Sequence, residues 1–149
     1  MLGIFSTEPF YTTYINLPDA HTPLSQRIRN NPKMSPFFDR ALGALNGCHI
    51  LCAPPSYSCL SYRNRKGFLS QNCLYTCDFD LQFVFCYTGW EGSVTDAQVF
   101  EGGLQAGLQI PNRYYYLADV GYPPSNHDLL TPYRGVRYHL AKWSRANQK

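Results

Sequence analysis

Hydrophobic and polar residues alternate in several distinct patterns along this chain, and each pattern predicts one element. Residues 44–52 are apolar at both alternating sets of positions, which is typical of a strand buried on both faces. Residues 72–77 and 81–88 predict a hairpin of two strands across the turn 78–80. The residues of the second strand predicted to share one face at period two are Leu81, Phe83, Phe85 and Tyr87.

A helical pattern follows this hairpin. Ser93 and Asp96 have the spacing of a capping box, so we expect a helix to start at Ser93 with Asp96 in the capping role. Its apolar face is predicted to consist of Ala97, Phe100 and Leu104, which recur at helical spacing.

The N-terminal part of the chain has a different character. Prolines interrupt residues 1–35, which predicts an irregular lead-in, and the folded domain is then 36–149. Ser35 and Pro36 are typical of a helix start and predict a short helix over 37–42.

The last predicted strand covers residues 113–118 and ends at Asp119, just before a turn. The predicted order is therefore strand, two-stranded hairpin, helix, strand. A helical crossover makes the final strand pairing parallel, whereas the hairpin is antiparallel. This is the order of a ribonuclease H-like core, an α/β fold with a mixed sheet.

Length and targeting signals limit the class of protein. The 149 residues suit one domain. Residues 2–5 are too short for the apolar core of a signal peptide, and no run approaches the roughly 18 apolar residues of a membrane span. We therefore expect no membrane association and an intracellular protein, in which thiols stay reduced.

The six cysteines raise the question of a zinc site. Cys48 and Cys52 are four positions apart, as are Cys73 and Cys77, whereas zinc ligands are more often paired as C-x2-C. We expect these thiols to be reduced and metal-free. A small zinc-binding protein is the alternative interpretation.

Basic residues gather in two places, although the net charge is only +3. One is the stretch 120–149, which has five Lys or Arg residues and one acid. The other is Arg63, Arg65 and Lys66, in a polar loop. Either cluster is a surface that contacts phosphates or a solvated surface.

Asp119 is the strongest candidate for chemistry, because ligand groups gather where strands of an α/β sheet end. The alternative is a turn aspartate that bonds its own backbone, which is also the default for Asp78 and Asp80. For His49 we expect a hydrogen-bonded core residue rather than a metal ligand.

Several short motifs follow one another along residues 28–143. They are Gly43-Ala44-Leu45-Asn46-Gly47-Cys48-His49-Ile50, Tyr62-Arg63-Asn64-Arg65-Lys66-Gly67, Cys77-Asp78-Phe79-Asp80, Gly89-Trp90-Glu91-Gly92-Ser93, Tyr115-Tyr116-Leu117-Ala118-Asp119 and Leu130-Thr131-Pro132-Tyr133-Arg134-Gly135. In this order they resemble the PIF/Harbinger transposases, a family of DDE endonucleases.

The resemblance implies a ribonuclease H-like sheet with flanking helices, on which three carboxylates hold two divalent cations, Mg²⁺ or Mn²⁺. The family's first acid corresponds to Asn46, which brings no charge and would bind a metal only weakly, and its second corresponds to Asp119. The third acid lies on a later helix of the family, so we expect the C-terminal part of the domain to be missing after Lys149.

The resemblance also implies an ancestral function. Such enzymes cut and transfer DNA phosphodiesters in the nucleus, with a Myb-like partner that supplies DNA binding. With the first acid replaced and the third absent, we expect this copy to be degenerate and inactive. The alternative is a domesticated, non-catalytic module that binds DNA or protein.

Two further expectations concern surfaces. In the context of the resemblance, weak and non-specific DNA contacts are predicted at Arg63, Arg65, Lys66, Arg134 and Arg137. Without the helix that packs on the sheet in the family, apolar surface would stay open, so we expect self-association or a covering partner.

Overall fold

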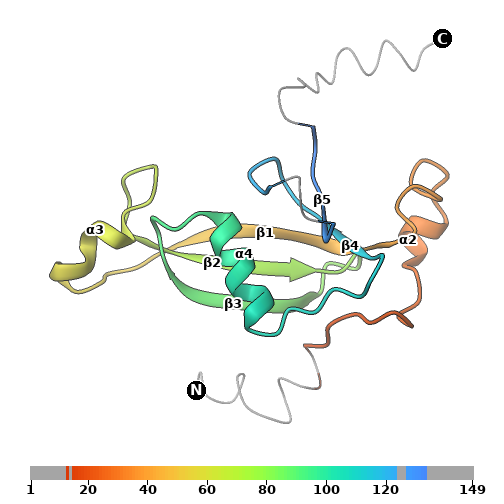
Figure 1. The fold of residues 1–149 in the computed structure, drawn as a ribbon, viewed down its shortest axis with the longest axis horizontal. Helices are drawn as coiled ribbons and strands as arrows, with labels where there is room; N and C mark the ends of the chain where they lie inside the picture. Colours follow the sequence, from red (N-terminus) through yellow and green to blue (C-terminus); the bar gives the residue numbers. More distant parts are fainter. Residues whose placement is uncertain (1–12, 14, 124–126, 134–149) are drawn as a thin grey trace.

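The computed structural model describes residues 13, 15–123 and 127–133, and they form a five-stranded mixed sheet with the strand order β3-β2-β1-β4-β5 (Figure 1). The strands are β1 (Ala41–Leu51), β2 (Ser70–Cys77), β3 (Phe83–Glu91), β4 (Tyr115–Leu117) and β5 (Leu129–Leu130). The helices are α2 (Gln26–Arg29), the 3₁₀ turn η2 (Ser56–Ser58), α3 (Cys59–Tyr62) and α4 (Asp96–Gln105).

The strand pairings confirm the predicted topology. β1 pairs antiparallel with β2, and β2 pairs antiparallel with β3. After the crossover through α4, the chain returns as β4, which is parallel to β1. The molecule therefore has the mixed α/β fold of a ribonuclease H-like core.

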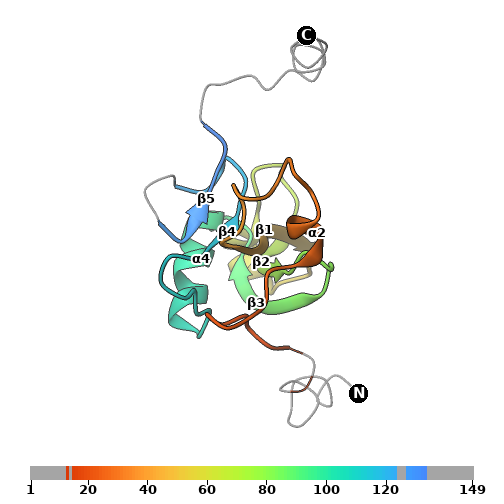
Figure 2. The same ribbon diagram turned by 90° about the vertical axis from the view of Figure 1, so that its right-hand side faces the viewer.

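The hydrophobic core lies between α4 and one face of the sheet (Figure 2). Val99 and Phe100 of α4 are almost completely buried, and the Phe100 ring packs edge-on against Tyr122 with centroids 6.2 Å apart. Leu45 and Leu74 reach this core from β1 and β2. Among the described residues, no helix is long and apolar enough to cross a membrane.

β1 is longer than predicted and less buried. Its first half is covered, but Ile50 and Leu51 are 47% and 73% exposed. The reason is that β4 pairs only with the stretch from Ala41 to Ala44. Beyond that point β1 has a described neighbour on one side only, so the prediction of a strand buried on both faces was wrong for this half.

The predicted helix over 37–42 is wrong. Residues 32–40 form turns, and Ala41 and Leu42 already belong to β1. Ala41 pairs with Tyr115 of β4. A pairing with a strand more than seventy residues away therefore prevails over a local helix signal.

β3 does not keep one face at strict period two. Leu81 has a φ of 64° in the turn, and Phe83 is 58% exposed, whereas Phe85 is buried. The β2–β3 register shifts between the partners of Phe83 and Phe85, so Val84 becomes buried as well. This irregularity moves Phe83 to the opposite face of the sheet from Phe85.

α4 begins later than predicted. Its N-cap is Thr95, whose hydroxyl accepts a hydrogen bond from the Gln98 N–H, and Gln98 completes the capping box. Asp96 is the first helical residue, and Ser93 lies in the preceding turn. Ser93 and Thr95 both have a hydroxyl that could cap the helix. The packing of α4 on β2 determines that Thr95 is the cap.

The final strands also differ from prediction. β4 is only three residues long and starts after Arg113, which has a φ of 72°. β5 was not predicted, because two residues carry no periodic pattern. It is held by backbone bonds from Tyr116 N to Asp128 O and from Ala118 N to Leu130 O.

The segment ahead of β1 packs against one end of the sheet. The side chain of Ile28 in α2 is 1% exposed. The Tyr114 hydroxyl donates to the Ala20 carbonyl at 3.2 Å, and the Tyr115 hydroxyl donates to the Phe37 carbonyl at 3.1 Å. The lead-in is therefore bonded to the residue just before β4, and the turn ahead of β1 is bonded to β4 itself.

Candidate functional site

Asn46 and Asp119 lie side by side at the centre of the sheet. Ala44 pairs with Leu117 in the parallel β1–β4 register, and Asn46 and Asp119 each follow two residues later. Both line one open hollow of about 410 Å³. The other residues of its lining are Ala44, Leu45, Tyr75, Cys77, Phe83, Leu117 and Ala118.

Asp119 also bonds the backbone of its own turn, which was the alternative interpretation of this residue. Its Oδ1 accepts a hydrogen bond from the Gly121 N–H at 2.7 Å, which closes the turn after β4. The residue is exposed. A carboxylate in this state can contact a ligand while it stabilises its own turn, so the two roles are compatible.

These two residues do not fit a two-metal centre. Such a centre needs several carboxylate oxygens to offset two divalent cations, whereas this pair supplies one carboxylate and one neutral amide. Across the described ranges, no three His, Cys, Asp or Glu side chains are grouped so that they could hold a metal ion.

All six cysteines are free thiols. Cys48 and Cys73 are direct partners in the β1–β2 register, and Cys86 lies on the neighbouring strand β3. Burial raises the pKa of the Cys73 thiol above its ordinary value, and partial desolvation also raises the pKa of the Cys86 thiol, although that residue is exposed. A higher pKa lowers the thiolate fraction, so neither thiol is activated for nucleophilic chemistry.

The predicted DNA-contact loop lies between α3 and β2. Arg63, Arg65 and Lys66 are all exposed. Arg65 and Lys66 line a second hollow together with His49 and the start of α4. Arg63 is used differently, because its Nη1 donates to the Gly67 carbonyl at 2.8 Å and so closes the loop.

Asn64 organises this loop, and the sequence analysis did not single it out. Its Oδ1 accepts from the N–H groups of Lys66 and Phe68 at 3.0 and 3.1 Å. Its Nδ2 donates to Oγ of the buried Ser70 at 3.0 Å. An asparagine before Arg-Lys-Gly is a recognisable turn signal, so local sequence could have identified it.

His49 is hydrogen-bonded as predicted, with Nδ1 3.1 Å from Ser70 Oγ. It is exposed, however, so the expectation of a core histidine was wrong. The cause is that His49 lies in the half of β1 that extends past β4. Ser70 thus links the basic loop to β1.

The remaining acids have structural roles. Asp78 Oδ1 accepts from the N–H groups of Asp80 and Gln82, both at 2.9 Å, which confirms the predicted turn. Asp96 is not the helix cap. Its Oδ1 accepts from Nδ2 of the fully buried Asn72 at 2.8 Å, which fixes the start of α4 to β2.

Arg134 and Arg137, the other predicted DNA contacts, lie outside the described residues. The described residues therefore form two candidate sites. One is the hollow with the Asn46–Asp119 pair, and the other, further along β1, is the hollow next to Arg65 and Lys66.

Comparison with known proteins links this geometry to a family. The family model described as DDE superfamily endonuclease matches residues 45–149. HARBI1 of Rattus norvegicus, which its name describes as a candidate nuclease, is 38% identical over 60 residues, and HARBI1 of Homo sapiens is 37% identical over 60 residues. The alignments cover 40% of this chain and 17% of each relative. No solved structure matches the chain.

Proposed function

Because this chain belongs to the DDE superfamily endonucleases, we propose that it is a nuclease-derived domain that binds DNA and no longer cleaves it. The observation that carries the proposal is that Asn46 of β1 and Asp119, two residues after the end of β4, line the same hollow. The resemblance to PIF/Harbinger transposases supports the proposal, because it implies that the first two acids of the ancestral enzyme correspond to these two positions.

The loss of cleavage follows from the chemistry of this pair. Asn46 supplies an amide oxygen that can touch a cation but carries no charge, and Asp119 supplies the one carboxylate of the hollow. Hydrolysis of a phosphodiester by two metals requires both charge compensation and fixed geometry. The described residues provide neither in full.

A nicking assay tests this part of the proposal. Supercoiled plasmid is incubated with Mg²⁺ or Mn²⁺ and the wild-type chain, Asp119→Ala or Asn46→Asp. We expect no nicking above the metal-only background in any of the three. Asn46→Asp is not expected to restore activity, since within the described ranges it creates only a pair of acids. Nicking by the wild type or by Asn46→Asp that disappears when Asp119→Ala is added would overturn the proposal.

DNA binding is tested separately. We expect weak, sequence-independent binding whose logarithm falls linearly with the logarithm of salt concentration, with a slope of about −0.9 for each phosphate contact. Fluorescence anisotropy with two unrelated duplexes at several salt concentrations measures both properties. Binding that does not depend on salt, or that prefers one duplex by more than tenfold, would contradict this proposal.

The cellular setting is also proposed from the resemblance. We propose a nuclear location and a Myb-like partner that supplies sequence-specific DNA binding. Co-precipitation of the tagged chain from nuclear extract, followed by mass spectrometry, tests the partner. Recovery without any Myb-like protein, together with a cytoplasmic location by microscopy, would refute this setting.

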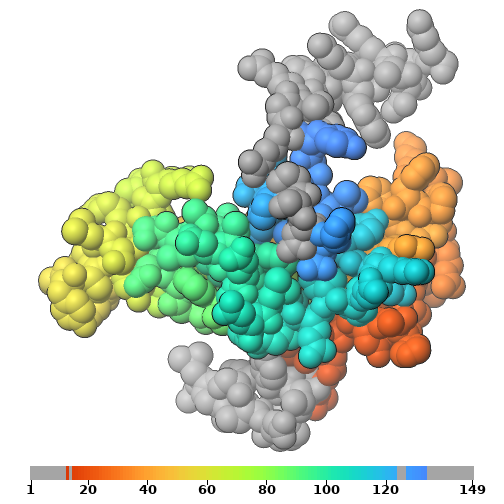
Figure 3. Space-filling model, in the orientation of Figure 1, coloured from red at the N-terminus to blue at the C-terminus, as the bar shows by residue number. Residues whose placement is uncertain are grey.

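A second candidate function is a protein-binding module. It is favoured by the projecting segment that contains η2 and α3 (Figure 3), where Leu51, Tyr57 and Leu60 are 73%, 91% and 84% exposed. Apolar side chains gathered at one projection are typical of an interaction surface. A wild-type chain that shows no DNA binding in the anisotropy assay would favour this alternative.

A further inference from the structure

The second hollow is the feature that the nuclease chemistry does not use. It has a volume of about 210 Å³ and lies between the basic loop and the start of α4. Its lining consists of His49, Asn64, Arg65, Lys66 and residues 92–96. We propose that this hollow binds one phosphate group, and, building on the proposed function, that the phosphate belongs to a DNA backbone.

The charges in the hollow favour an anion. Arg65 and Lys66 contribute two positive charges, and an arginine can bind phosphate oxygens with two parallel hydrogen bonds. Asp96 contributes one negative charge, but its Oδ1 is already bonded to Asn72. The described side chains of the lining therefore have a net positive charge. We expect them to bind a single phosphate with modest affinity.

Hydrogen bonds within the loop hold the backbone that carries Arg65 and Lys66 before any ligand binds. Asn64 bonds the backbone on both sides of Gly67, and Arg63 bonds the Gly67 carbonyl itself. The Asn64–Ser70 bond then fixes the loop to the sheet. A preorganised site loses less conformational entropy on binding, so it binds an anion more tightly than a flexible basic loop would.

This assignment separates Arg63 from Arg65 and Lys66, which the sequence analysis treated alike. Arg63 is a positioning residue, because its guanidinium is bonded to the Gly67 carbonyl within the loop. Arg65 and Lys66 are the residues that face the ligand. Loss of Arg63 should therefore disturb the loop, whereas loss of Arg65 and Lys66 should remove the anion site.

The position of the hollow connects it to the Asn46–Asp119 pair. His49 is three residues further along β1 than Asn46. At about 3.3 Å per residue, this separation is roughly 10 Å. Because they are three positions apart, Asn46 and His49 lie on opposite faces of β1. One strand of B-DNA presents a phosphate about every 3.4 Å of helix axis, so a phosphate about three nucleotides away reaches the hollow only where the backbone passes the free edge of β1. Because β1 extends past β4 here, DNA along this edge can contact groups on either face of β1.

The first test uses inorganic phosphate as the probe. The amide signals of the ¹⁵N-labelled chain are followed by NMR during the titration. We expect saturable shifts at Arg65, Lys66, Ser93 and Val94 that disappear in the double variant Arg65→Gln, Lys66→Gln. Shifts that persist in this variant, or that spread evenly over the surface, would overturn the assignment of the hollow.

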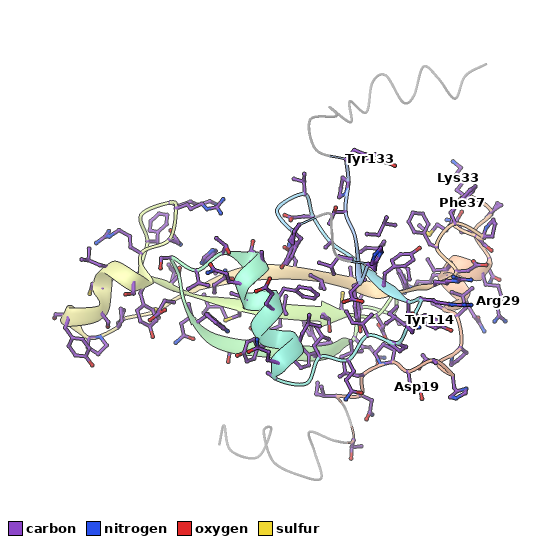
Figure 4. The ribbon with its side chains drawn as sticks, in the orientation of Figure 1. Asp19, Arg29, Lys33, Phe37, Tyr114 and Tyr133 are labelled. Atoms are coloured by element: carbon purple, nitrogen blue, oxygen red, sulfur yellow. The ribbon has the colours of Figure 1, made fainter. Side chains whose placement is uncertain are left out.

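The matched control removes two positive charges from the opposite end of the molecule. Arg29 and Lys33 lie there, close to α2 (Figure 4). The double variant Arg29→Gln, Lys33→Gln has the same net charge as the first one. It should retain the phosphate-induced shifts, and it should bind DNA within twofold of the wild type.

The second test uses DNA and separates the two proposals. Arg65→Gln, Lys66→Gln should weaken binding at least tenfold and flatten the salt slope by about 0.9, which corresponds to the one phosphate contact of the hollow. If both double variants weaken DNA binding equally, the assignment of the phosphate site to this hollow is wrong, but the proposal that the domain binds DNA is retained. If phosphate binds in the hollow but DNA does not bind at all, the proposed function is wrong and the anion site stands.

Asn64→Leu provides a variant without any change of charge. It should weaken phosphate and DNA binding severalfold, because the loop loses its internal bonds while Arg65 and Lys66 remain. A thermal melt checks that this variant folds. Unchanged binding by folded Asn64→Leu would show that preorganisation of the loop has no role. If Asn64→Leu does not fold, the double variant Arg65→Gln, Lys66→Gln alone tests the assignment of the phosphate site.

Discussion

Two glycines of β1 allow other groups to approach the strand closely. A Cβ at Gly47 would collide with the Asp96 carboxylate, and a Cβ at Gly43 would collide with the Cys77 carbonyl. The two contacts differ in kind, because one neighbour is a side chain and the other is backbone. Gly47 is also next to Asn46, so Asp96 supports β1 at the candidate site from the side of α4.

The Gly47–Asp96 contact can be measured by a double-mutant cycle. Gly47→Ala should lower the free energy of unfolding by about 1–3 kcal/mol, the usual cost of overpacking. Addition of Asp96→Ala should recover part of that loss, because the colliding group is removed. Urea unfolding of the four proteins provides the coupling energy.

Gly43→Ala is the control for this cycle. It should also destabilise the protein, but Asp96→Ala should not relieve it, because the Cys77 carbonyl is part of the β1–β2 ladder. Strictly additive effects of Gly47→Ala and Asp96→Ala would show that the close approach costs nothing.

The start of α4 illustrates how an element is positioned. Thr95 and Gln98 form the capping box, and Asn72 of β2 bonds both the Val94 carbonyl and Asp96. The helix is therefore anchored to the sheet at its first turn. This anchor also forms one wall of the phosphate hollow.

Replacement of Thr95 by Ala should lower the free energy of unfolding by about 1 kcal/mol, since the first turn loses its capping oxygen. Ser93→Ala removes a hydroxyl from the same turn and should change stability by less than about 0.5 kcal/mol, as is usual for surface positions. The free energies of unfolding of both variants, measured by chemical denaturation, show which residue is the N-cap. A larger loss in Ser93→Ala would restore the original prediction that Ser93 is the cap.

Among the described residues, α4 covers one face of the sheet (Figure 2), and several side chains of the other face are exposed. Cys48, Phe83 and Cys86 are exposed on strands β1 and β3. Phe83 packs against Tyr75 with ring centroids 5.4 Å apart, within the hollow that contains Asn46 and Asp119. The candidate site thus lies on an apolar surface.

We expect this open face to bind a hydrophobic dye and to drive self-association. Light scattering coupled to size exclusion should show a mass that rises with protein concentration, and Phe83→Ser should reduce the rise. Phe37→Ser, which removes the same kind of exposed ring from the turn ahead of β1, is the control and should have a smaller effect. A sharp monomer peak at all concentrations without dye binding would contradict this expectation.

Much of the architecture was accessible from local patterns. Alternating and helical periodicities placed β2, β3 and α4 within a few residues, and the crossover implied the parallel β4. The candidate pair Asn46 and Asp119 came from motifs, and the structure has both residues in the lining of one hollow. Some errors concerned positions where two local signals compete, such as Ser93 against Thr95, and others concerned segments whose structure depends on a distant strand, such as residues 37–42.

The identity of β2, β3 and α4 and the chemical types at the candidate site follow from the sequence, because periodicity, turn residues and the side chains of Asn46 and Asp119 are local properties. Pairings between distant segments follow from the tertiary structure alone. β4 ends before β1 does, which leaves half of β1 exposed, and Ser70 joins the basic loop to His49. The phosphate hollow brings together segments from β1, the basic loop and α4, and no local pattern records which distant segments meet.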